Sequence, residues 1–151
     1  MSNSPLLLDR YFFVKTLLEA QSKADLKAIN SIETSVELSK AEGKPRDYLI
    51  SLTVRLLPHE ESQPGYLGEF VVMGFFKVHS EYPDEKCDKL VSVNGASMLY
   101  GVVREMVANL TARGPWPMLT LVAMSFSDVL GDQTAPKEVS ECQKLPAKLE
   151  A

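Results

Sequence analysis

Residues 66–79 read YLGEFVVMGFFKVH, and this stretch decides the fold because it is apolar on both faces of a strand. Its side chains alternate with a period of two, which is the spacing of a β-strand. One face carries Tyr66, Phe70, Val72, Phe76 and Val78, and the other carries Leu67, Val71, Met73 and Phe75. Both faces of such a strand must be covered. We expect the chain's own helix on one side and a partner surface on the other.

Three earlier stretches show the same period-two pattern, at residues 5–20, 31–39 and 47–57. The links EGKPRD and PHEESQPG, which precede the third and fourth strands, are rich in the residues that form turns. Both links are too short to hold a crossover helix, so the strands they join must run antiparallel. The sequence therefore predicts four strands in an antiparallel sheet.

A long helix is predicted after the fourth strand. It begins near Asn94 or Ser97 as the N-cap and ends at Arg113, with Gly114 following as the C-terminal glycine. Apolar residues cover well over half of its circumference, whereas a surface helix needs a stripe of only about 100°. The surplus predicts self-association, through an interface formed by Leu99, Val103, Met106 and Leu110.

The expected fold class is α+β, with a four-stranded antiparallel sheet and a long helix in the C-terminal half. Residues 1–130 are predicted to form one domain, since a chain of 151 residues is long enough for a single core. Residues 131–151 are polar and contain two prolines. They are predicted to be a loose tail or to hold one short helix around residues 137–144.

Composition and charge exclude several classes of protein. The chain is 45% hydrophobic with a net charge of −4, which is typical of a globular protein and argues against a nucleic-acid binder. The sequence contains neither the apolar core of a signal peptide nor the roughly 18 apolar residues of a membrane span. Cys87 and Cys142 are expected to be exposed and unpaired, and a cytoplasmic location is expected.

No catalytic residue, metal ligand set or cofactor motif is predicted. His59 and His79 have no Cys or carboxylate ligands at metal-binding spacing, and the acids beside Cys87 raise the pKa expected for its thiol. The serious enzyme alternative is a hot-dog-fold thioesterase, which also wraps an antiparallel sheet on a long apolar helix. Its base would have to be Glu105, for which a solvated surface position is the favoured interpretation.

Two stretches resemble the SecB family of export chaperones. The segment ARGPWPMLTLVAMSFSDVL, residues 112–130, is similar to the family's late signature through Arg113, Gly114, Trp116, Pro117, Leu119, Leu121 and Phe126. The fourth strand is similar to the family's Leu-x-Glu strand through Leu67, Glu69, Gly74 and Phe76.

The resemblance implies a homotetramer, built as a dimer of dimers through the helices, that holds unfolded polypeptides without ATP. Pro115 and Pro117 keep the chain extended after the helix, where the segment would line a groove for the client. The implied client contacts are Trp116, Met118, Leu119, Leu121, Met124 and Phe126. An alternative for Trp116 is that it only packs over the edge of the sheet.

The resemblance also implies an acceptor for the client, the SecA motor, which would dock on Glu19, Leu67 and Glu69. Lys15 stands where the family typically has a second acid in the first strand. An alternative function is therefore a SecB-like chaperone dedicated to a toxin–antitoxin client. Neither function involves nucleic acid or insertion into a membrane.

Overall fold

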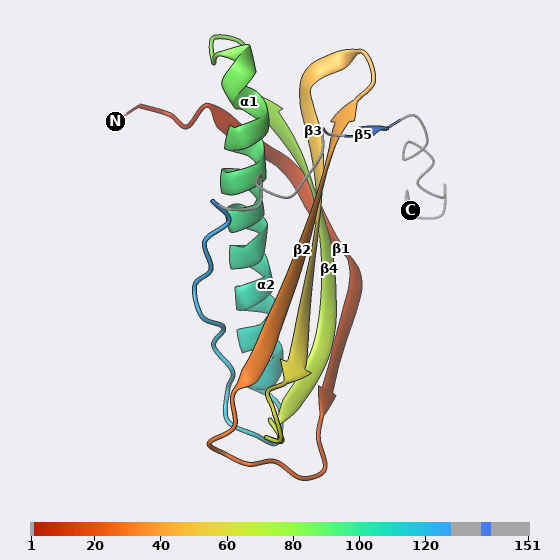
Figure 1. Ribbon diagram of the computed structural model, residues 1–151, viewed down its shortest axis with the longest axis vertical. Coiled ribbons are helices and arrows are strands. Elements are labelled where there is room, and N and C mark those ends of the chain that lie inside the picture. The colour runs from red at the N-terminus through yellow and green to blue at the C-terminus, as the bar shows by residue number, and fades with distance from the viewer. Residues whose placement is uncertain (1, 128–136, 140–151) are drawn as a thin grey trace.

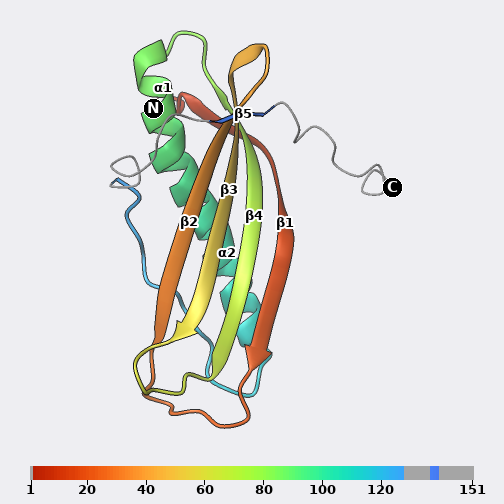
Figure 2. The same cartoon turned by 45° about the vertical axis from the view of Figure 1, so that its right-hand side comes forward.

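Four long antiparallel strands form the sheet in the computed structural model, which describes residues 2–127 and 137–139. They are β1 (Leu6–Ala20), β2 (Asn30–Ala41), β3 (Lys44–Pro58) and β4 (Tyr66–Val78). Their order in the sheet is β1-β4-β3-β2, so β1 and β2 lie at opposite sides of the β3–β4 pair. Residues 21–29, called here the crossover loop, therefore cross the end of the sheet (Figure 2). The predicted antiparallel sheet is confirmed.

Strand β1 departs from simple alternation. Its pairing with β4 shifts register between Leu8 and Arg10 and again between Phe13 and Lys15. Each extra residue moves the following side chains to the opposite face. Lys15 and Glu19 share one face, since both lie beyond the second shift.

The helical layer covers one face of the sheet (Figure 1). It runs without a break through α1 (Asp84–Leu90), the π-helical turn η1 (Val91–Gly95) and α2 (Ala96–Thr111). The predicted N-caps are therefore wrong: Asn94 lies inside the run, and the Ser97 hydroxyl donates to the Val93 backbone oxygen one turn back. The start signal is Pro83 followed by two acids in the first turn, which favours a helix.

The core lies between the helix and the inner face of the sheet. Every second residue of β3 from Tyr48 to Leu56 is buried, and Phe70, Val72 and Phe76 of β4 join them. Helix and sheet approach closely at Gly95, where an added Cβ would lie 2.5 Å from Ile50 Cδ1. Glycine allows this contact between η1 and β3 without a shift, whereas a larger residue would push the end of the Ile50 side chain aside within the core.

The opposite face, called here the outer face, carries the second apolar side of β4. Leu67, Val71, Met73 and Phe75 are partly buried there. The Arg10 guanidinium lies 5.0 Å from the centre of the Phe75 ring and 5.7 Å from that of Phe12. Long cationic side chains thus provide part of the cover that the sequence led us to expect from a partner.

Strand β5 (Lys137–Val139) pairs in parallel with the end of β2 and adds a fifth strand to the sheet. Its three residues form a strand where a loose tail or a helix around 137–144 was expected. The rest of that expectation, with Cys142, lies outside the described residues.

Candidate functional site

Trp116 is fixed by three neighbours. Its indole Nε1–H donates to the Gln21 backbone oxygen at 2.9 Å, and its backbone N–H donates to the Tyr66 hydroxyl at 3.1 Å. That hydroxyl also lies 2.8 Å from the Trp116 backbone oxygen, to which it donates. The ring packs on Gly65, where an added Cβ would lie 2.7 Å from Trp116 Cγ. Trp116 thus packs on the end of the sheet. This supports the alternative in which Trp116 has a packing role and is not itself a client contact.

Residues 115–127, called here the post-helix segment, run back along α2 (Figure 1). They lie outside any strand. Side chains of the helix fix their backbone: the Arg104 Nε–H donates to the Leu121 oxygen at 2.9 Å, and the Tyr100 hydroxyl donates to the Val122 oxygen at 2.7 Å. Burial raises the pKa of the Tyr100 hydroxyl, which keeps it protonated as a donor.

Two predicted client contacts are buried inside the protomer. Leu121 and Phe126 each expose 2% of their surface, and the Phe126 ring meets the Tyr100 ring edge to face with centroids 5.7 Å apart. Both residues belong to the core because their side chains pack inward, while Val122, Ala123 and Ser125 between them are exposed. Leu121 and Phe126 are therefore corrected from client contacts to core residues, whereas Trp116, Leu119 and Met124 are partly buried and Met118 is exposed.

A groove, called here the crossover groove, lies between the crossover loop and the post-helix segment. Its volume is about 150 Å³, and its walls come from the loop, the start of β4 and residues 116–119. Large apolar side chains on both segments remain 58% to 70% exposed, namely Leu26, Ile29 and Met118. Leu26 and Met118 line the groove directly, and Ile29 stands between the lining residues Ala28 and Asn30.

The sequence analysis missed the crossover-loop half of this groove. The stretch QSKADLKAIN has no periodicity that would mark it as functional. Its one usable signal is the pair Leu26 and Ile29, two large apolar residues in an otherwise polar loop. The place of Leu26 beside Met118 follows from the strand order, which carries the loop past the end of α2.

The predicted acceptor-docking residues come together on the outer face. Glu19 lies opposite Leu67, and Leu17 lies opposite Glu69, so acids and leucines alternate over two adjacent strands. Leu17 is 41% exposed and was missed, because its place opposite Glu69 depends on how β1 pairs with β4, which the alternation within β1 does not show. We call these four residues the outer-face patch.

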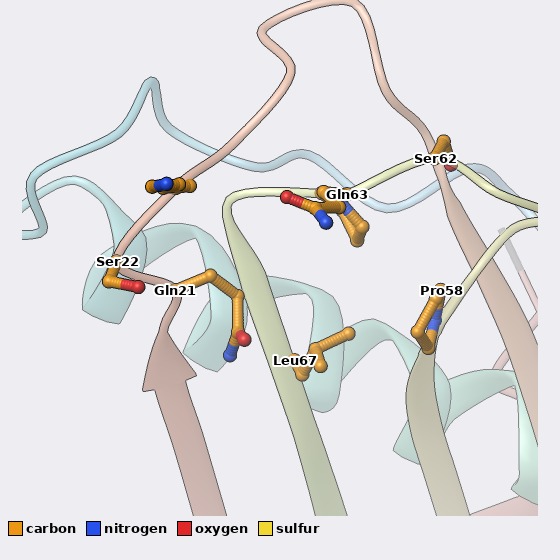
Figure 3. A pocket seen from close by; sticks show the side chains of 8 residues that line it. Gln21, Ser22, Pro58, Ser62, Gln63 and Leu67 are labelled. Atoms are coloured by element: carbon orange, nitrogen blue, oxygen red, sulfur yellow. The ribbon is translucent and has the colours of Figure 1, made fainter.

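A polar hollow of about 500 Å³ opens beside this patch (Figure 3). Leu67 forms one wall, and the side chains of Gln21 and Gln63 face the same space. The walls come from the chain just after β1, the last residue of β3 and the β3–β4 loop. The hollow thus extends the outer-face patch to the end of the sheet, with amide groups that can bond a peptide backbone.

Half of the predicted oligomer interface is occupied by the protomer's own core. Leu99 and Val103 are fully buried against the sheet, so neither can meet another copy of the chain. Met106 is partly buried and Leu110 is 36% exposed. The surplus apolar surface of α2 lies on the side that includes Met98, which is exposed as well.

Cys87 is buried, contrary to the expectation of an exposed thiol. It lies on the inner side of α1 and meets the Arg46 guanidinium at 3.7 Å, and burial raises the pKa of its thiol. Arg46 ties β3 to the start of α1 through bonds to the His79 and Tyr82 backbone oxygens. Among residues 2–127 and 137–139, no group of three or more His, Cys, Asp or Glu side chains is placed to hold a metal ion.

None of the helices within the described residues has the length and apolarity needed to span a bilayer.

The model of the family described as SecB, preprotein translocase subunit SecB, matches residues 14–137. The protein-export protein SecB of Anaplasma phagocytophilum (strain HZ) is 24% identical over 113 residues, which are 72% of each chain. The family-model match begins within β1 and includes β2, β3, β4 and the helical run.

The solved structure of the Mycobacterium tuberculosis SecB-like chaperone Rv1957, in complex with a ChAD peptide from the antitoxin HigA1 (Rv1956), has a similar fold. The TM-score is 0.62 at 18% identity, over 80% of this chain and 88% of the other.

Proposed function

The chain belongs to the SecB family of protein-export chaperones, and we propose that it holds unfolded polypeptides without ATP by covering their apolar side chains in the crossover groove. The observation that supports the groove is the exposure of Leu26, Ile29 and Met118 around it. Monomeric surfaces seldom gather large apolar side chains without a partner. Trp116 forms a rigid back to the groove, because its indole and its backbone are both hydrogen-bonded.

The size of the groove fits one large apolar side chain of a client at a time. Covering about 200 Å² of client surface contributes about 5 kcal/mol, from which the cost of ordering the client is subtracted. One groove is therefore weak, and several grooves on one assembly add avidity for a long unfolded chain. A homotetramer, arranged as a dimer of dimers through α2, supplies these grooves.

The client is proposed to pass to a SecA motor in the cytoplasm. The motor docks on the outer-face patch, where Glu19, Leu67 and Glu69 point to the same side of the sheet. This side is opposite to α2, so the motor can approach the patch without displacing the helical layer (Figure 1).

We prefer a chaperone that holds many unfolded polypeptides to a chaperone dedicated to one antitoxin client. The Mycobacterium tuberculosis chaperone bound to its antitoxin peptide shares the fold of this chain at 18% identity, and a shared fold does not select the client. The thioesterase alternative is not proposed, because Glu105 is exposed on α2 and the family consists of chaperones.

The test is suppression of aggregation. The purified chain should slow the aggregation of a chemically unfolded test protein without ATP, measured by light scattering. Leu26→Ser together with Met118→Ser should weaken this protection several-fold, because both exposed apolar walls of the groove are lost.

Leu57→Ser is the matched control, since it removes another exposed leucine, from β3 on the outer face. It should leave protection unchanged. Equal loss of protection in the control and the groove variant would contradict the proposed site, and no protection by the parent chain would contradict holding itself.

A further inference from the structure

A chain of ion pairs crosses the outer face from one side of the antiparallel sheet to the other. The Lys15 Nζ lies 3.0 Å from Glu69 Oε2, and the Arg55 Nε lies 3.6 Å from Glu69 Oε1. The Arg55 Nη1 then lies 3.2 Å from Glu33 Oε2. Each of β1, β4, β3 and β2 supplies one residue, so we call these four residues the charge ladder.

The register of the strands explains the ladder. Arg55 lies directly opposite both Glu69 on β4 and Glu33 on β2, while Lys15 lies opposite Val71 and reaches diagonally to Glu69. Opposite and diagonal neighbours on one face are within reach of long side chains. The ladder is therefore built into the pairing of the sheet.

The consequence is that the Glu69 carboxylate has a cation at each of its oxygens. The hydrogen bond from Lys15 is the largest cause of a pKa for Glu69 that lies below the usual range of glutamate. Glu69 is also the acid that a docking motor would need. A basic side chain from a partner meets a carboxylate that is already paired inside the protomer.

We propose that Lys15 is a specificity-determining residue of the outer-face patch: a partner docks through Glu69 only by bringing a cation that displaces the Lys15 ammonium. This inference rests on the proposed docking of a motor at this patch. Lys15 is the partner that can be displaced, because it has one ionic contact, stands on an edge strand and is 48% exposed. Arg55 is held by both Glu33 and Glu69 and stays in place.

The charge of the surrounding face determines which partner fits. In the half of the outer face near Leu67, between the rows of Leu67 and Val71, the strand registers place three acids, Glu19, Glu33 and Glu69, beside two cations, Lys15 and Arg55. This excess of acid attracts a Lys/Arg-rich segment, and the exposed Leu17 beside Leu67 accepts an apolar side chain of the same segment. The partner is therefore a basic protein segment with an apolar residue next to its cations.

The experiment is calorimetric titration of the full chain with a purified SecA motor, at low and at high salt. Lys15→Gln should tighten binding by about two- to five-fold, the range expected when one exposed ion pair no longer competes. Lys77→Gln is the matched control, because Lys77 pairs with Asp9 at the far end of the same face. It removes the same charge and should leave the affinity unchanged.

A double-mutant cycle separates displacement from general charge effects. Glu69→Gln should weaken binding, and in that background Lys15→Gln should no longer tighten it. In the free chain, NMR should show the pKa of Glu69 rising in Lys15→Gln, since its main hydrogen bond is lost.

Three results would overturn the proposal: equal effects of Lys15→Gln and Lys77→Gln, tightening that persists without Glu69, or no binding of the motor at any salt concentration. Protection of an unfolded test protein is measured separately and depends on the crossover groove. If the motor does not bind but protection is intact, motor docking and the role of Lys15 are rejected, and the holding of unfolded polypeptides is not.

Discussion

At the scale of single residues, Leu121 and Val122 show that a core position and a surface position can be adjacent in the post-helix segment. Leu121 exposes 2% of its surface and Val122 exposes 66%, although they are neighbours in the chain. The Arg104 and Tyr100 bonds to their backbone oxygens fix which of the two points inward. The family motif predicted Leu121 as a client contact and left out Val122, although only Val122 of the two is open to a partner.

The two residues should respond differently to the same substitution. Leu121→Ser should lower the free energy of unfolding by about 2–5 kcal/mol, since it opens a cavity and buries a hydroxyl group. Val122→Ser should change it by less than about 0.5 kcal/mol. Urea unfolding followed by circular dichroism measures both, and equal costs would show that the segment does not pack along α2 as described.

At the scale of elements, the two sides of the helical run have different surroundings. Its inner side must approach the sheet closely, and its outer side carries the apolar surface that remains for other copies. Gly95 and Gly101 lie on these two sides. An added Cβ at Gly95 meets Ile50 of β3, whereas one at Gly101 has no neighbour within 4 Å.

The two glycines provide a matched pair. Gly95→Ala should destabilise the fold by about 1–3 kcal/mol, because the new methyl group overpacks the contact between helix and sheet. Gly101→Ala should stabilise it by about 1 kcal/mol, since alanine favours a helix over glycine and meets no obstacle. Thermal unfolding decides the signs, and stabilisation by both substitutions would contradict the close approach.

At the scale of the whole molecule, the proposed tetramer requires the part of α2 that the sheet leaves uncovered. Leu99 and Val103 stabilise the protomer itself, so only the remaining apolar residues are free to bury surface between copies. Met106 is the informative position, because it is partly exposed and also packs against the edge of the core.

Met106→Glu should reduce the tetramer to a smaller species, since it places an unpaired charge in the proposed interface. Ser97→Glu is the control: residues nine positions apart lie on opposite sides of a helix, and Ser97 is exposed. Light scattering gives the mass, and circular dichroism checks the fold. A folded monomeric parent chain would remove the assembly from the proposed function.

The sequence by itself determined the elements and the family. The alternation in residues 47–57 and 66–79 predicted two strands to within a few residues, and the short links made the sheet antiparallel. These features follow from local geometry, because a period of two and a turn are each specified by neighbouring residues. The motif around Trp116 identified the family in the same way.

Only the tertiary structure decided which residues are available for function. The pairing register of β1 with β4 placed Leu17 beside Glu69, the strand order brought Leu26 to Met118, and close packing buried Leu121 and Leu99. Each of these outcomes depends on contacts between segments far apart in the chain. A local pattern shows that a residue is apolar, but the position of the neighbouring element determines whether it packs in the core or remains open to a partner.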